Sequence, residues 1–271
     1  MTDVKASAMA TFATQLKAWR KSRGWSQVEL AAKMGYSDSL VSGIETQAKT
    51  PTLDFAAKCD EVFGAPGTFV ALHELVSREA WPSYFAPIID FEIMAIRIHE
   101  WELRSVPGLL QTEEYARSVI SAGKPRLGEA ALERAVHGRL ARQRIFECDN
   151  PPMLWTVLHE GALRHVIGGP AVMAEQLDKL LAVGRSPDVV IQIMPFTAND
   201  HPGTDGPIMV MDFDGASSVA YTECNGGGMI TETHNAVADL MTTMNMIRAA
   251  ALPPRDSMNL LRQMRSDIGH D

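Results

Sequence analysis

The apolar residues of the first seventy positions recur at the spacing of short amphipathic helices. Phe12, Leu16 and Trp19 lie three or four residues apart, which predicts a helix over about 10–22. Glycines follow the apolar and basic stretches, and Ser or Thr precedes the next helix, as at many helix ends and starts. The pattern predicts five helices in this region, beginning at about residues 10, 26, 37, 52 and 66.

The second and third of these helices are short and follow each other closely. Ser26 with Glu29 three residues later forms a capping-box pattern, and Gly35 ends the second helix after two turns. Ser37 can cap the third helix, in which Val41 and Ile44 are the expected core residues. Two short helices joined by a glycine-containing turn are typical of a helix-turn-helix.

The pattern changes beyond a boundary near 77–83, where strands and helices mix. Residues 98–104 alternate strictly between apolar and polar, which predicts a half-buried strand. We therefore expect an all-α five-helix helix-turn-helix domain over 1–77, and an α+β domain with a mixed or antiparallel sheet over 78–271. The further strands expected in the second domain cover residues 153–159, 189–194, 207–213 and 217–223. Its expected helices cover about residues 84–97, 112–122, 126–147, 160–166, 171–183, 233–250 and 255–268.

Charge is distributed unevenly along the chain. Its formal net charge is −8, which alone argues against a nucleic-acid binder. Residues 1–52, however, hold seven Lys or Arg against four Asp or Glu, whereas residues 53–77 hold one against four. The remaining 194 residues therefore carry the whole −8. An acidic protein with a locally basic front end repels polyanions except at that front end.

The three cysteines and the apolar runs bear on the cellular compartment. Cys59, Cys148 and Cys224 are isolated, with no CxxC pair, so we expect neither a disulfide framework nor a zinc site. No apolar run is long enough for a transmembrane helix, and the N-terminus lacks a signal-peptide profile. These features predict a cytoplasmic protein that does not bind membranes.

The front end resembles the Xre/Cro/phage-repressor family through the string RGWSQVELAAKMGYSDSLVSGIETQAKTPTLDFAAK. That resemblance implies that the helix starting near Ser37 is the recognition helix, which enters the major groove of double-stranded DNA. By position it implies that Gln27 contacts a phosphate and braces the DNA-facing side of the recognition helix, and that Lys49 contacts the DNA backbone. The remaining implied DNA-facing residues are Ser37, Asp38, Ser39 and Ser42.

Two further positions of the resemblance need separate comment. Arg20 and Glu45 match the family's buried ion pair, although two solvated charges are the alternative. Gly43, also assigned to the DNA-binding face, stands where many family members carry a long base-reading side chain. Glycine has no side chain that could contact a base, so direct readout of the DNA sequence by this helix is expected to be modest. Phosphate contacts and dimer spacing would supply much of the specificity.

The second domain resembles the C-terminal domain of actinobacterial WhiJ-like and antitoxin-like regulators. The matching strings include VPGLLQTEEYARSVI, RLARQRIF, VLHEGALRHVIGG and VVIQIMPF. The resemblance implies transcription regulation, often together with a small partner protein from a neighbouring gene. It implies no established enzymatic chemistry.

No catalytic or metal-binding motif stands out, so we expect no enzyme, no cofactor and no metal. His159, Glu160 and His165 do not form HExxH, and the glycines 226–228 are interpreted as a mobile hairpin loop rather than a phosphate cradle. The loop 197–207 is expected to be solvated, although it could border a ligand pocket. An anion site or internal ion pairs are the alternatives to a polar helix face for Arg134, Arg139, Arg142 and Arg144. Ordinary core packing is favoured over a partner groove for Met241, Met244, Met246, Met258 and Met264.

Taken together, the sequence predicts a sequence-specific DNA-binding transcriptional regulator of the cytoplasm, associated with the nucleoid. A homodimer is expected, because one short recognition helix contacts too few bases to select a genomic site. The second domain is expected to dimerise and to bind a small partner protein. The alternative is a metabolite-sensing regulator with a small-molecule pocket in that domain.

Overall fold

The computed structural model describes residues 7–268 apart from 80, 83 and 225. The chain divides into two compact units. The helical unit comprises Met1–Ser83 and Arg126–Gly138, and the sheet unit comprises Tyr84–Pro125 and Arg139–Asp271. The predicted boundaries 1–77 and 78–271 did not anticipate that residues 126–138 group with the N-terminal helices.

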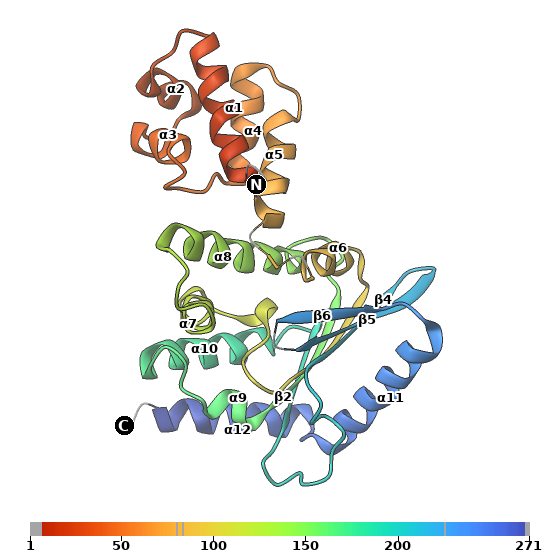
Figure 1. Ribbon diagram of the computed structural model, residues 1–271. Coiled ribbons are helices and arrows are strands. Elements are labelled where there is room, and N and C mark those ends of the chain that lie inside the picture. Colours follow the sequence, from red (N-terminus) through yellow and green to blue (C-terminus); the bar gives the residue numbers. More distant parts are fainter. Residues whose placement is uncertain (1–6, 80, 83, 225, 269–271) are drawn as a thin grey trace. The chain divides into compact units, whose positions relative to one another are not determined.

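The helical unit contains the five predicted N-terminal helices (Figure 1). A Ser or Thr hydroxyl caps each of the first four, and the predicted caps Ser26, Ser37 and Thr52 are confirmed. Gly35 and Gly64 end α2 and α4 in the left-handed conformation, with φ of 73° and 66°. The helices are α1 (Ala8–Ser22), α2 (Gln27–Met34), α3 (Asp38–Glu45), α4 (Leu53–Phe63) and α5 (Thr68–Glu79).

The sheet unit is an α+β fold around a six-stranded mixed sheet, as the sequence predicts. The strand order is β3-β2-β1-β4-β5-β6. The β1–β2 and β2–β3 pairs are parallel, whereas β1–β4, β4–β5 and β5–β6 are antiparallel. The strands are β1 (Arg97–Glu102), β2 (Met153–His159), β3 (Val189–Met194), β4 (Ile208–Phe213), β5 (Ala216–Cys224) and β6 (Gly227–Thr231).

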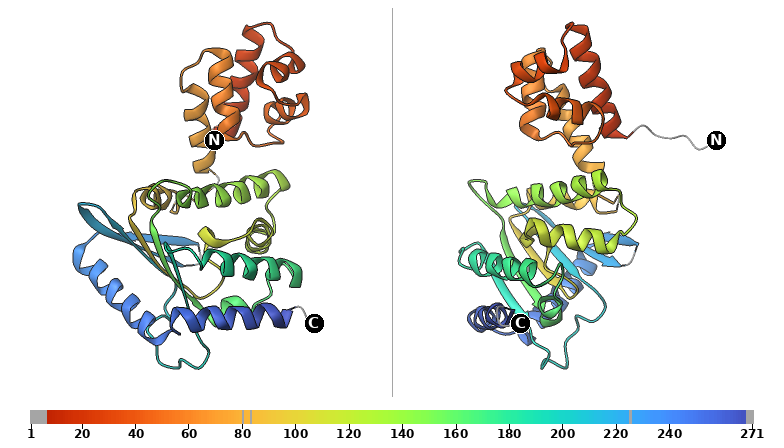
Figure 2. Two further views of the ribbon diagram at one scale, coloured as in Figure 1. Left: turned by 180° about the vertical axis from the view of Figure 1, so that it is seen from behind. Right: turned by 90° about the vertical axis from the view of Figure 1, so that its left-hand side faces the viewer.

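Helices cover both faces of this sheet. One face carries the larger core, to which α6, α7, α10 and α12 contribute, and α11 packs on the opposite face (Figures 1 and 2). The helices of the unit are α6 (Ala86–Met94), α7 (Glu113–Gly123), α9 (Glu160–Arg164), α10 (Pro170–Val183), α11 (His234–Ala250) and α12 (Pro254–Ile268). Helix α8 (Glu129–Arg142) continues into a 3-10 helix, η2 (Gln143–Phe146), and a second 3-10 turn, η1 (Gly108–Leu110), precedes α7.

Two predictions for the sheet are wrong. Strand β1 was predicted to be half-buried, yet its residues 98–101 are all buried, because β1 lies inside the sheet with helices over both faces. The glycines 226–228 were interpreted as a mobile hairpin loop; Gly226 does lie in the turn of the β5–β6 hairpin, but Gly227 and Gly228 begin β6. A side chain on Gly228 would collide with the ring of Tyr221, so the tyrosine requires glycine at this position.

Candidate nucleic-acid interface

Helix α3 is fixed at its start and along one side. The Ser37 hydroxyl accepts a hydrogen bond from the Leu40 amide at 3.3 Å, which satisfies one of the open N–H groups at the helix start. Val41 and Ile44 are fully buried, as predicted. Because these two residues hold one side of the helix in the core, Ser37, Asp38 and Ser39 are left exposed.

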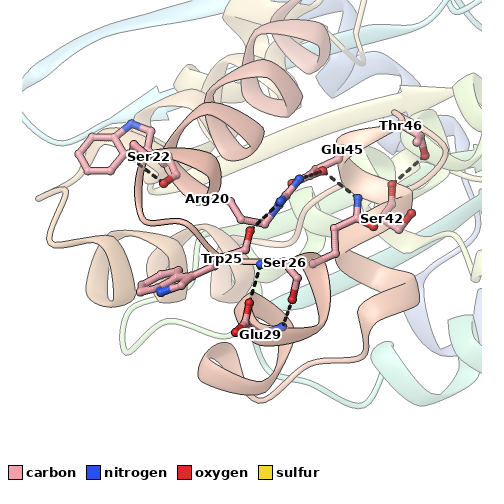
Figure 3. Close-up of polar contacts among 10 residues, drawn as sticks. Arg20, Ser22, Trp25, Ser26, Glu29, Ser42, Glu45 and Thr46 are labelled. Atoms are coloured by element: carbon pink, nitrogen blue, oxygen red, sulfur yellow. Dashed lines mark hydrogen bonds and ion pairs between the residues drawn. The ribbon is translucent and has the colours of Figure 1, made fainter.

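A buried network connects α3 to α1 and α2 (Figure 3). Arg20 Nε and Nη2 donate to the two carboxylate oxygens of Glu45 at 2.6 and 2.8 Å. Arg20 Nη1 also donates to the Trp25 carbonyl oxygen at 2.8 Å, and Gln27 Nε2 donates to Glu45 Oε2 at 2.8 Å. The geometry is therefore a bidentate ion pair with every arm occupied, not two solvated charges.

The electrostatics of this network agree with its geometry. Burial by itself raises the pKa of Glu45, but the hydrogen bonds from Arg20 and Gln27 outweigh it and hold the pKa below its usual range. The bond to Glu45 likewise raises the pKa of Arg20. Both groups remain charged at neutral pH, so the network holds α3 at a fixed angle to α1.

Gln27 braces α3, as the family resemblance implied. Its side-chain amide donates to Glu45 inside the network. The phosphate contact implied for this residue therefore stays a prediction, and a bracing role for α3 is what the structure displays.

Gly43 and Lys49 form a unit on the outer side of α3. A side chain on Gly43 would begin 2.8 Å from Lys49 Cγ and Cδ, so the lysine stem occupies the space above the glycine. The Lys49 amide donates to the Gly43 carbonyl oxygen at 3.0 Å. Gln47, with a φ of 64°, lies in the turn that brings the chain back over the helix. The stem of this exposed lysine thus covers the helix surface at Gly43.

The remaining candidate residues share the exposed surface of α3. The Ser37 and Ser39 hydroxyl oxygens lie 3.1 Å apart, and the Asp38 carboxylate accepts from the Ser39 amide at 2.9 Å. Ser42 is half-buried one turn later, and its side chain has no hydrogen bond among those recorded for the described residues. The structure thus gathers Ser37, Asp38, Ser39, Ser42, Gly43 and Lys49 on one helix and the loop that follows it.

The sheet unit buries polar groups that the sequence did not reveal. His99 Nε2 lies 3.1 Å from Asp212 Oδ2, and its Nδ1 accepts from Arg248 Nη2 at 2.6 Å. Burial and the nearby Arg248 lower the pKa of His99 despite the Asp212 carboxylate, so the ring is neutral. Arg248 also stacks on the Trp155 ring at 4.5 Å, and the whole arrangement fastens α11 to the sheet.

Two of the four arginines near α8 point inward rather than forming a polar helix face. Arg142 is buried and forms a bidentate ion pair with Glu92, in which Nε lies 2.8 Å from the carboxylate. Arg139 donates to the Gln111 side chain at 3.1 Å. Arg144, in contrast, is exposed. Internal ion pairing, the alternative left open by the sequence, thus applies to Arg142.

The loop 197–207 packs against the sheet unit more closely than predicted. The Trp101 indole N–H donates to the Gly203 carbonyl oxygen at 2.9 Å, and the His201 ring meets the Trp101 ring edge-on at 5.6 Å. A side chain on Gly203 would begin 2.7 Å from the indole, so the loop needs glycine there. Only the outer part of this segment is solvated.

The late methionines mainly fill the core, as the sequence favoured. Met244 and Met264 are buried, and Met241 and Met258 are partly buried against the two cores of the sheet unit. Met246 is the exposed member of the five.

The described residues contain no cluster of three His, Cys, Asp or Glu side chains arranged to hold a metal ion. No helix in that part of the chain is long and apolar enough to cross a membrane.

Two protein-family models match the chain. One, described as "Domain of unknown function (DUF5753)", covers residues 85–263, and the other, described as "Helix-turn-helix", covers residues 16–70. Neither a curated protein nor a solved structure matches significantly. The second model supports the predicted helix-turn-helix regulator, whereas the likeness to WhiJ-like regulators stays a prediction.

Proposed function

The chain belongs to the family described as a domain of unknown function (DUF5753), and we propose that it is a sequence-specific transcriptional regulator. The helix-turn-helix match supports DNA binding, and one structural observation carries the proposal further. Helix α3 is braced from inside by the Arg20–Glu45–Gln27 network and presents Ser39, Ser42 and Lys49 on its outer side.

Each outward group has a role in this proposal. Ser39 and Ser42 read base edges in the major groove, where a hydroxyl can both donate and accept. Lys49 meets the phosphate backbone, and its packing over Gly43 holds its ammonium group beside the helix. Asp38 accepts a bond from its own helix start and can also accept from a cytosine amino group.

The protein acts as a homodimer in this proposal, on half-sites about 34 Å apart. One α3 carrying Gly43 offers few base contacts, and two copies double them. We assign dimerisation to the region 78–271, because among the described residues it has more exposed large apolar side chains than the first 77 residues have. The regulator would work in the cytoplasm on nucleoid DNA and would carry out no catalysis itself.

We also propose that a small partner protein binds the sheet unit. Its acidic character suits a partner with a basic edge. Three apolar side chains at the end of α6 and just beyond it are exposed, namely Ile93, Met94 and Ile96. They provide an apolar centre that the mostly buried methionines do not.

The decisive experiment measures operator binding by full-length variants. Ser39→Ala and Ser42→Ala should reduce discrimination among DNA sites by roughly 1–3 kcal/mol. Lys49→Ala should weaken all sites alike and lower the salt slope by about one. Lys58→Ala is the control, because Lys58 lies on α4 in an ion pair with Glu61. If the serine variants select sites as the parent does, the groove assignment is wrong.

Two more measurements test the assembly. Sedimentation of the full-length protein with a two-half-site operator should give two chains per DNA, and one chain per DNA would contradict the homodimer. Titrating the product of a neighbouring small gene with and without operator DNA tests the partner. Linkage requires that a partner which alters DNA affinity have its own affinity altered by the same factor. Equal partner affinity in both titrations would mean that the two sites are not coupled.

A further inference from the structure

Three polar side chains lie side by side on the buried face of the central strands in the sheet unit. Glu100 and Glu102 alternate with Trp101 on β1, and Thr156 of β2 is in register with Glu100. They share the face of Ile98 and Leu158, which belong to the larger core. Because neighbouring strands are about 4.8 Å apart and alternate residues about 7 Å apart, the three side chains start within one small triangle. We call these three residues the acceptor triad.

Each member of the triad has a polar atom with no hydrogen-bond partner among the described residues. These atoms are Glu100 Oε2, Glu102 Oε2 and Thr156 Oγ1. Glu100 is 6% exposed and Thr156 is fully buried. Buried polar atoms in native proteins are nearly always hydrogen-bonded, because leaving one unpaired costs its full desolvation energy. Three such atoms side by side call for a missing partner.

The charges around the triad indicate the sign of that partner. The groups that act on Glu100 are Glu102, Glu92, Arg142 and Arg139, and those that act on Glu102 include Arg104 and Glu223. When all are ionised, the four carboxylates exceed the three guanidinium groups by one negative charge. Arg142 is committed to Glu92, so it does not neutralise the triad. The site therefore lacks one positive charge.

Burial and the neighbouring carboxylates raise the pKa of Glu100 to about 8 and hold that of Glu102, despite the opposing Arg104, at about 7. Both pKa values are raised toward neutrality, so this carboxyl pair can take up protons near pH 7. A proton relieves the charge and supplies one O–H donor, whereas an ammonium group relieves the charge and supplies three N–H donors.

We propose that the acceptor triad binds the primary ammonium group of a small organic amine. A primary ammonium carries one positive charge, three N–H donors and no acceptor, which matches two carboxylate oxygens and one hydroxyl. The side chains that surround the triad on this face are apolar, so the rest of a bound amine should be apolar as well. Binding at this site does not depend on the proposed DNA-binding function, but a role for the amine as an effector rests on it.

Calorimetric titration of the full-length protein tests the site with three cations of similar size. The probes are butylamine, N,N-dimethylbutylamine and butyltrimethylammonium, which carry three, one and no N–H donors at the same charge. We expect affinity to fall by at least about tenfold from the first to the second, since each lost bond to a charged group is worth about one such factor. Equal affinities, or no binding of any probe at millimolar concentration, would overturn the proposal.

Glu100→Gln removes the charge of the side chain while keeping its shape. This substitution should weaken butylamine binding at least about tenfold. The matched control is Glu147→Gln, which alters a side chain that is 71% exposed in the same unit and should leave the affinity unchanged. A thermal melt of each variant verifies the fold. A folded Glu100→Gln protein that binds butylamine like the parent would contradict the site.

Proton release provides a second readout. Butylamine binding should expel protons from the carboxyl pair, so the observed heat at pH 7 should vary with the ionisation enthalpy of the buffer. This variation should shrink in Glu100→Gln. Heat that is independent of the buffer in the parent protein would mean that the amine does not meet the pair.

Repeating the titration with operator DNA separates the site from its use. A change of DNA affinity with butylamine supports an effector role. If the amine binds but the protein binds no DNA, the site stands and the proposed function fails. If the amine binds and DNA affinity is constant, the effector role is overturned.

Discussion

The helical unit and the sheet unit both bury carboxylates, yet they treat them differently. Glu45 receives three side-chain hydrogen bonds from Arg20 and Gln27 and stays ionised. Glu100 retains an unbonded oxygen and has a raised pKa. The first arrangement holds a helix in place, whereas the second leaves a buried carboxyl oxygen without a hydrogen-bond donor among the described residues. Burial alone therefore does not reveal what a charged residue does; the state of its partners does.

Removing Glu45 should have the largest effect on this comparison. Glu45→Ala leaves Arg20 buried and unpaired, which should lower the free energy of unfolding by roughly 3–5 kcal/mol. Urea unfolding of the full-length protein measures it. Glu61→Ala is the control, because Glu61 pairs with Lys58 at the surface and should matter little. Similar losses in the two variants would show that the network has no special role.

Neutralising Glu100 should instead raise the free energy of unfolding. Its pKa is higher in the folded than in the unfolded state, so the folded state binds more protons between about pH 4.5 and pH 8. Stability should therefore fall as the pH rises through this window. Glu100→Gln should remove this pH dependence. At pH 8 the free energy of unfolding of the variant should exceed that of the parent protein by roughly 2–4 kcal/mol. Urea unfolding at pH 5 and pH 8 measures it, and a variant with the parent's pH dependence would contradict the assignment.

Gln27→Ala should have an intermediate effect, since it removes one of the three side-chain bonds to Glu45. A hydrogen bond to a charged group is worth about 1.5–3 kcal/mol, and we expect a loss near the lower end because Arg20 remains. Thermal melts compared with Gln15→Ala, at an exposed glutamine of α1 outside the network, measure it. A loss as large as that of Glu45→Ala would mean that the ion pair needs Gln27.

Gly43→Ala should give the smallest change and raise stability. Alanine favours an α-helix over glycine by about 1 kcal/mol, while the new methyl group only has to displace the flexible stem of Lys49. Stability should rise by up to about 1 kcal/mol, and affinity for all DNA sites should fall as the lysine moves. Ala48→Gly, at an exposed position in the adjacent loop, is the control. Unchanged DNA affinity would separate Lys49 from the interface.

The sequence predicted the helical unit well because its signals are local. Ser26, Glu29 and Gly35 each act within one turn of the chain, so caps and helix ends could be identified from neighbours. The bracing role of Gln27 came from the family resemblance, whereas its partner Glu45, 18 positions away, could be identified only from the fold. The stem of Lys49 over Gly43 depends in turn on the left-handed residue Gln47, which no pattern indicated.

For the sheet unit, the sequence predicted the helices and strands but not the surroundings of individual side chains. The strands over 153–159 and 189–194 have the predicted bounds. Alternation along β1 suggested a solvent face for Glu100 and Glu102, because a strand pattern cannot tell which strands will flank it or what will cover it. The parallel register that places Thr156 beside Glu100 spans 56 residues, so that placement came only with the fold.

The strand order also governs how the chain acquires its structure during synthesis. Helices α1–α5 pack mainly through contacts close in sequence, so they can fold early and quickly. The β4–β5–β6 meander is also local. Strand β1, in contrast, waits for β2 and then for β4, which emerges from the ribosome about a hundred residues later. During synthesis the helices can therefore fold while the sheet is still incomplete, and β1 keeps one unpaired edge until β4 has been made.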